Sequence, residues 1–167
     1  MATYLSIPLL GALVIIQSTI VPEARIAGGM PDLIFLVVLA WGLMAGFEQG
    51  VTWAFIGGIL QDLVSSLPLG TTSLALVLAV TIASLVLGRV HPHNVIYPAL
   101  AAGVGTLFVH LVTLAVLLAV GRPLPLFDLL VYVTLPSMVY NVVVMIPVYR
   151  ILGTFYLSAR PRRVQGV

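Results

Sequence analysis

Apolar residues run along almost the whole chain in six stretches, which short clusters of glycine, proline and charged residues separate. Apolar stretches of about 18 or more residues are typical of transmembrane helices. The pattern therefore predicts an all-α integral membrane protein, folded as a bundle of about six transmembrane helices. The predicted helices cover residues 3–21, 31–47, 51–64, 71–88, 95–120 and 126–149.

Turn and proline signals set the expected ends of these helices. Pro31 suits the first position of the second helix, and Asp32 follows where the helix dipole favours a negative charge. The second and third helices are expected to meet in a tight turn formed by Glu48, Gln49 and Gly50. Two prolines are expected to kink the sixth helix: Pro136 and Pro147.

The second and third predicted helices are short for a membrane crossing. At about 1.5 Å per residue each spans roughly 25 Å or less, against about 30 Å of hydrocarbon. Such helices are usually sheltered by other protein segments, or they thin the bilayer locally. They are also compatible with a funnel at one membrane face.

The composition leaves no room for a sizeable soluble domain. Of 167 residues, 61% are hydrophobic and only 7% are charged, whereas soluble domains usually carry about 25% charged residues. The chain has no cysteine, which excludes disulfides, thiolate nucleophiles and cysteine metal sites. The first segment is interpreted as a retained helix, so residues 1–155 form the expected transmembrane domain and residues 156–167 a basic cytoplasmic tail.

The arginines predict the orientation in the membrane, because basic residues favour the cytoplasmic side. With the N-terminus in the cytoplasm, six crossings leave only Arg25 and Arg122 outside. The N- and C-termini are therefore expected to be cytoplasmic. The tail can rest on anionic lipid headgroups. The arginines then expected inside are Arg89, Arg150, Arg160, Arg162 and Arg163.

Four polar residues form a candidate site near the outer face: Asp32, Gln61, Asp62 and Gln17. Asp62 is the most informative, because a charge inside the bilayer is costly and needs a polar partner or water. Two interpretations stay open at this point. Asp62 either caps the loop formed by residues 65–70, or it is a buried polar anchor or ligand contact.

Small residues recur at every fourth position and form a candidate packing or partner surface: Gly42, Gly46, Gly50, Ala54 and Gly58. Such spacing lets helices in lipid approach closely. The close approach is either within this chain or against a partner helix. Two further residues are candidate intramembrane polar contacts, His110 and Asn141. His110 has no second histidine or carboxylate at helical spacing to complete a metal site.

Sequence motifs of catalysis are absent: there is no G-x-S-x-G, H-E-x-x-H or P-loop. We therefore predict a protein without enzymatic activity, cofactor, metal site or nucleic-acid partner.

One stretch of about forty residues is more specific than hydropathy. It contains Pro31-Asp32-Leu33, a glycine-rich third helix ending in Gln61-Asp62, and a Pro68-Leu69-Gly70 loop. This stretch resembles the rod shape-determining protein MreD family. Ser66 stands where that family is expected to have glycine.

The resemblance implies a protein of the bacterial inner membrane that binds MreC, which has one transmembrane helix and an external domain. Together they would support lateral peptidoglycan synthesis with RodA, a transpeptidase and the actin-like MreB. The family's six-helix arrangement is also similar to the substrate-binding subunits of energy-coupling-factor transporters. The alternative function is therefore a small solute- or lipid-binding subunit with an outward-facing pocket.

Overall fold

The computed structural model describes residues 2–19 and 28–159, and the side chains of residues 7–19 and 28–158. These residues form helices and connecting turns without a strand, so the all-helical prediction is confirmed. Five helices are separate, and the sixth is continuous although it has three labelled parts. The elements are α1 Ala2–Thr19, α2 Leu33–Ala45, α3 Phe47–Val64, α4 Thr71–Leu87, α5 Ile96–Ala119, and the three parts α6 Leu126–Leu129, η2 Leu130–Thr134 and α7 Leu135–Ala159.

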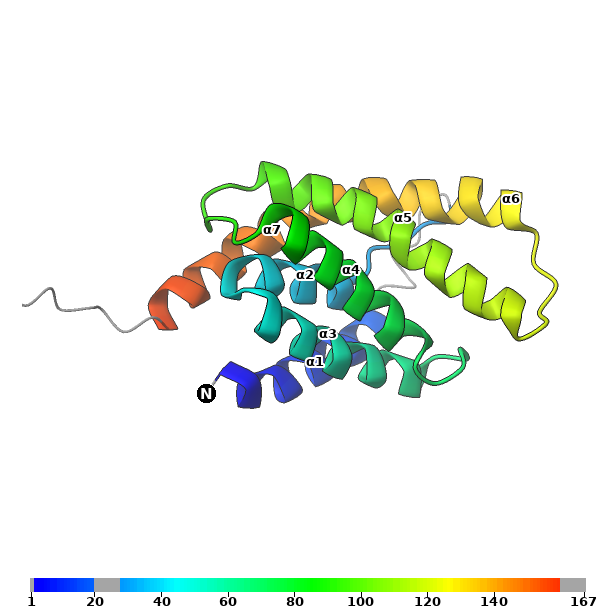
Figure 1. Cartoon of the computed structure of the whole chain (residues 1–167), viewed down its shortest axis with the longest axis horizontal. Helices are drawn as coiled ribbons and strands as arrows, with labels where there is room; N and C mark the ends of the chain where they lie inside the picture. The colour runs from blue at the N-terminus through cyan, green and yellow to red at the C-terminus, as the bar shows by residue number, and fades with distance from the viewer. Residues whose placement is uncertain (1, 20–27, 160–167) are drawn as a thin grey trace, which may run out of the picture.

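Helix α2 is the core of the bundle. Every residue from Ile34 to Ala45 is buried, and α2 contacts α1, α3, α4, α5 and α7. In Figure 1 it lies between α3 and α7. Its 13 residues span only about 20 Å. The shelter expected for a short helix is therefore supplied by the chain itself.

The start of α2 differs from the prediction at Pro31. The helix begins at Leu33, and Asp32 is its N-cap residue, with φ −103° and ψ 91°. The Asp32 carboxylate accepts a hydrogen bond from the Phe35 backbone N–H. An extended N-cap whose side chain binds the third helical N–H is a favourable start for a helix. Asp32 therefore lies just before the helix rather than within its first turn.

The predicted turn at residues 48–50 is wrong in position. The chain turns at Gly46, whose φ of +102° lies in the region that favours glycine. Residues 47–50 already belong to α3. Gly50 faces Gly42 across the turn, and a Cβ on Gly50 would lie 2.6 Å from the Gly42 Cα. The two helices can pack this closely only because both positions lack a side chain.

The last helix is ten residues longer than the prediction, because it continues past Tyr149 to Ala159. Both expected prolines lie in its part α7. Pro147 is inside α7, and Pro136 is the second residue of α7, just after the π-helical part η2. Proline removes a backbone donor, and a π segment is one way in which a helix absorbs that loss.

The last helix also crosses the expected domain boundary at residue 155. The tail arginines at 160–163 lie outside the described residues, as does Arg25.

The helices run back and forth, so the bundle has two ends (Figure 1). The Arg89 end holds the start of α1, the α2–α3 turn, the α4–α5 loop and the end of α7. The Asp62 end holds the α3–α4 loop and the connection from α5 to α6. There α5 and α6 extend beyond α1–α4 in Figure 1. Two helices are long and apolar enough to cross a membrane, with mean hydropathies of 2.1 and 2.0: Ile96–Ala119 and Leu126–Ser158.

Candidate functional site

The Asp32 carboxylate is the centre of a polar network between the helices. Gln17 of α1 donates from Nε2 to Asp32 Oδ1 at 3.0 Å, and its Oε1 accepts from the Ile34 N–H at 3.2 Å. Gln61 of α3 donates from Nε2 to Asp32 Oδ2 at 3.5 Å. The N-cap of α2 is thus tied by side chains to the two helices that flank it.

The other side of Asp32 faces the two longest helices. The Asp32 N–H donates to Asn141 Oδ1 at 2.9 Å, and Asn141 Nδ2 donates to Thr106 Oγ1 at 2.8 Å. Thr106 Oγ1 in turn donates to the Ala102 carbonyl at 2.6 Å. Beside it, the Met30 N–H donates to Ser137 Oγ at 3.2 Å. The network therefore joins α1, α2, α3, α5 and α7.

The network lies about halfway along α5 and the last helix, where Thr106 and Asn141 are both buried. Polar groups in an apolar interior are costly unless they bind one another. Most of the network satisfies this requirement. One group does not: the buried Gln61 Oε1 has no hydrogen-bond partner among the described residues.

Asp62 belongs to a separate arrangement, although it follows Gln61 directly. Its side chain is 2% exposed. The carboxylate accepts from the N–H groups of Gly70 at 2.8 Å, Thr72 at 3.0 Å and Ser73 at 3.4 Å. Neighbouring helical residues project about 100° apart, so Gln61 reaches Asp32 while Asp62 reaches the start of α4. Asp62 is thus both buried and a cap, and the four predicted residues do not form one cluster.

We expect Asp62→Ala to lower the free energy of unfolding by about 2 kcal/mol or more, because buried N–H groups would lose their acceptor. Asp62→Asn should lose less, since an amide oxygen still accepts from one or two of these groups. Thermal unfolding in detergent measures both. Equal losses for the two variants would show that charge, rather than capping, carries the stabilisation.

His110 pairs with a single polar side chain. Its Nδ1 lies 2.9 Å from Thr134 Oγ1, which in turn donates to the Leu129 carbonyl across the π segment at 3.2 Å. The two residues border a cavity of about 180 Å³ that is otherwise mainly apolar. In the described part of the chain, no group of three potential metal-binding side chains gathers. His110 thus links α5 to η2.

The small residues face other parts of the same chain. Gly42 and Gly50 touch across the α2–α3 turn, Ala54 is fully buried, and Gly58 lies against the Ser73 backbone of α4. Gly46 lies beneath the Arg89 guanidinium. These positions are therefore occupied by intrachain packing.

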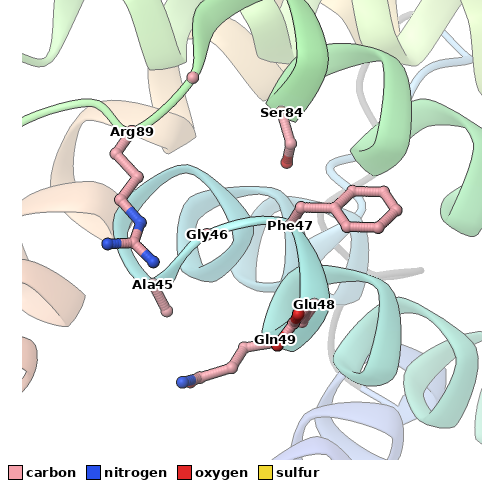
Figure 2. Close-up of a pocket in the computed structure, with 8 residues that line it drawn as sticks. Ala45, Gly46, Phe47, Glu48, Gln49, Ser84 and Arg89 are labelled. Carbon is pink, nitrogen blue, oxygen red and sulfur yellow. The ribbon is translucent and has the colours of Figure 1, made fainter.

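Sequence reasoning missed several residues that the structure brings into polar sites, among them Thr106, Ser137 and Arg89. Thr106 and Ser137 are ordinary in apolar helices, and only their contacts with segments far along the chain distinguish them. Arg89 entered only the count of charges, yet it borders a cavity of about 380 Å³ at its end of the bundle (Figure 2). The cavities beside His110 and Arg89, and a third between α4 and α5, are lined by none of the four predicted residues Asp32, Gln61, Asp62 and Gln17.

Comparison with known proteins agrees with the motif-bearing stretch and extends it. The family described as "rod shape-determining protein MreD" matches residues 1–158 of the 167-residue chain. No curated protein and no solved structure matches it. The match covers all six helices and both polar arrangements, around Asp32 and Asp62, almost to the last helical residue. The chain therefore belongs to the MreD family of rod shape-determining membrane proteins.

Proposed function

We propose that this chain is a non-catalytic scaffold of the bacterial cytoplasmic membrane, which binds MreC and supports cell-wall elongation. The observation that carries the proposal is the family match over residues 1–158. RodA, a transpeptidase and MreB would be reached through the same complex. The fold supports a scaffold, because its polar side chains largely bind one another inside the bundle.

We also propose that all six helices cross the membrane. Large apolar side chains are exposed along α4, α5 and α7, where only lipid or another apolar surface would cover them favourably. Helices α1, α3 and α4 have 17 or 18 residues and span about 26 Å, so they cross with slight thinning of the bilayer. The shorter α2 is enclosed by the other helices.

The Arg89 end is proposed to be cytoplasmic, following the positive-inside rule. Because the chain has no cysteine, single cysteines report the topology cleanly. In intact cells, a membrane-impermeant thiol reagent should label Gly121→Cys and Ser66→Cys, which lie at the Asp62 end. It should label Asn94→Cys only after the membrane is opened. The reverse pattern would invert the orientation.

Recognition of MreC is proposed to occur mainly within the membrane. A single transmembrane helix binds in lipid through shape-matched packing and a few hydrogen bonds. The small-residue surface that the glycine spacing suggested is filled by intrachain contacts, because α2 is buried and Gly58 lies against α4. The α4–α5 groove is the better candidate. It has a volume of about 330 Å³ and is lined by Ala79, Ile82, Ala83, Val86, Leu87, Tyr97, Leu100, Ala101, Val104, Gly105 and Phe108.

Filling this groove should therefore displace the partner. We expect Ala83→Phe to reduce copurification of tagged MreC about tenfold or more, because a large side chain on the groove wall prevents close helix approach. The matched control is Val143→Phe, which adds a similar ring to an exposed position on α7. Replacing the MreC transmembrane helix by an unrelated apolar helix should have the same effect as Ala83→Phe.

Two outcomes would contradict this placement. Equal loss with Ala83→Phe and Val143→Phe would mean that the added ring acts without regard to site. Undiminished copurification after the MreC helix swap would move the contact to the loops outside the membrane.

A further inference from the structure

A cavity at the Arg89 end carries an inference that does not depend on MreC. It lies where the α2–α3 turn meets the end of α4, and its volume is about 380 Å³. Figure 2 shows Arg89 on one side of the turn and Ser84 above it. The lining residues are Ala45, Gly46, Phe47, Glu48, Gln49, Ser84, Gly88 and Arg89.

Arg89 brings a positive charge to this cavity and is held there by its backbone. The next residue, Val90, donates its N–H to the Leu43 carbonyl at 2.7 Å and accepts from the Tyr149 hydroxyl at 2.9 Å. The guanidinium lies over Gly46, where an added Cβ would be 2.8 Å from Arg89 Nε. Because no side chain is present at Gly46, the guanidinium can approach the turn.

The start of α3 adds donors beneath the guanidinium. Gly46 is its N-cap and offers no side-chain cap, so the first N–H groups of the helix are free to bind an anion. Gln49 lies in the same turn. Its Oε1 accepts from Trp41 Nε1 at 3.2 Å, which orients its amide and leaves Nε2 as a further donor. Figure 2 shows this amide extending to the side of the turn where Arg89 lies.

The unpaired hydroxyl of Ser84 is independent evidence for a ligand. Its side chain is 9% exposed, and its hydroxyl has no hydrogen-bond partner among the described residues. Buried hydroxyl groups are normally satisfied, and an exception calls for an unseen partner. Ser84 lines the cavity, so a group bound there supplies an acceptor for it.

We propose that this cavity binds the phosphate group of an anionic membrane phospholipid. Phosphate oxygens match an arginine fork and free helix N–H groups. A lipid source fits because exposed apolar side chains adjoin the polar lining: Phe47, the first residue of α3, and Leu85, which follows Ser84 in the last turn of α4. These side chains would contact the acyl chains. Glu48 is the one acidic group in the lining and opposes the phosphate charge.

The test uses the purified full chain in detergent, titrated with short-chain phosphatidylglycerol, and follows the thermal unfolding temperature. Diacylglycerol with the same acyl chains lacks the phosphate, and inorganic phosphate lacks the chains. We expect phosphatidylglycerol to raise the unfolding temperature at a lower concentration than diacylglycerol or inorganic phosphate does. Arg89→Gln should weaken this binding about tenfold, since it removes a charge-assisted hydrogen bond. Glu48→Gln should strengthen it.

Matched variants separate a built site from general attraction to positive charge. Arg150→Gln removes an exposed arginine of α7 that lies outside the cavity, and it should leave the affinity within about twofold. Ser84→Ala should weaken binding while the lipid-free protein unfolds at the same or a higher temperature, because the hydroxyl has no partner among the described residues to lose and is costly to bury unpaired.

Several results would overturn the proposal. Equal stabilisation by diacylglycerol would show that the acyl chains alone bind. Stabilisation by inorganic phosphate as strong as that by the lipid, and equally sensitive to Arg89→Gln, would support the phosphate site but contradict the lipid source. Unchanged lipid affinity in Arg89→Gln, together with lost MreC copurification, would assign the cavity to a protein partner. The lipid titration contains no MreC, so it does not depend on whether the proposed scaffold function is correct.

Discussion

Gly58→Ala is expected to lower the free energy of unfolding by about 3 kcal/mol, although it adds only one methyl group. A Cβ at Gly58 would lie against the Cα of Ser73, and 2.6 Å from the Ser73 backbone nitrogen. These are backbone atoms in the first turn of α4, which the Asp62 carboxylate holds through the Ser73 N–H. The Ser73 backbone cannot move away from Gly58 without breaking that cap. The cost of the added methyl group therefore falls at the upper end of the usual range for overpacking.

Thermal unfolding in detergent measures this loss, and Gly11→Ala is the matched control. Gly11 lies within α1, and nothing lies within 4 Å of its added Cβ. Alanine is a better helix former than glycine by about 1 kcal/mol, so this variant should be as stable as the original or slightly more so. A similar loss in both variants would mean that α3 and α4 are not packed backbone to backbone at Gly58.

Asp32→Ala is expected to destabilise the fold by about 3 kcal/mol or more. The substitution removes the α2 cap, worth about 1 kcal/mol. It also leaves the Gln17 and Gln61 amides without their acceptor inside the bundle, at about 1–3 kcal/mol for each buried unsatisfied group. Asp32→Asn should cost much less, because asparagine caps helices as well as aspartate and still offers an acceptor.

Asp128→Ala provides the control for this loss in the same unfolding measurement. Asp128 is an exposed acid in the first turn of α6, so its removal should change stability by less than about 0.5 kcal/mol. If Asp32→Ala unfolded at the same temperature as Asp128→Ala, the network around Asp32 would contribute nothing to stability. An Asp32→Asn variant as unstable as Asp32→Ala would show that the negative charge itself is required.

The helices were predictable because long apolar runs and proline or glycine breaks are local signals. The turn at Gly46 was not, since the glycines at 42, 46 and 50 share one spacing and nothing local distinguishes the turn from the packing contact. The turn is identified only by the φ of +102° at Gly46 and by the contact between Gly42 and Gly50. The end of the last helix was also missed, because the prediction stopped at Tyr149, just before the charge of Arg150, and the helix continues to Ala159.

The candidate site shows the same limit. Asp32, Gln17 and Gln61 were singled out as rare polar residues in apolar segments, and the structure brings them together. Asp62 was grouped with them by sequence proximity, but helix geometry directs it to the α4 backbone. Thr106 and Ser84 carried no signal, since hydroxyl side chains are common in apolar helices. Their importance depends on which partner, or which missing partner, the tertiary arrangement gives them.

The enclosure of α2 has a consequence for how the chain is made. Its N-cap binds Asn141, which lies 109 residues further along. At about 5–20 residues per second, a ribosome needs roughly 5–20 s to reach it. During that interval the part of α7 that carries Asn141 is not yet made and does not cover α2. We therefore expect the Asp32 amide of the growing chain to stay without this partner, and the centre of the protein to close only after residue 141 has been made.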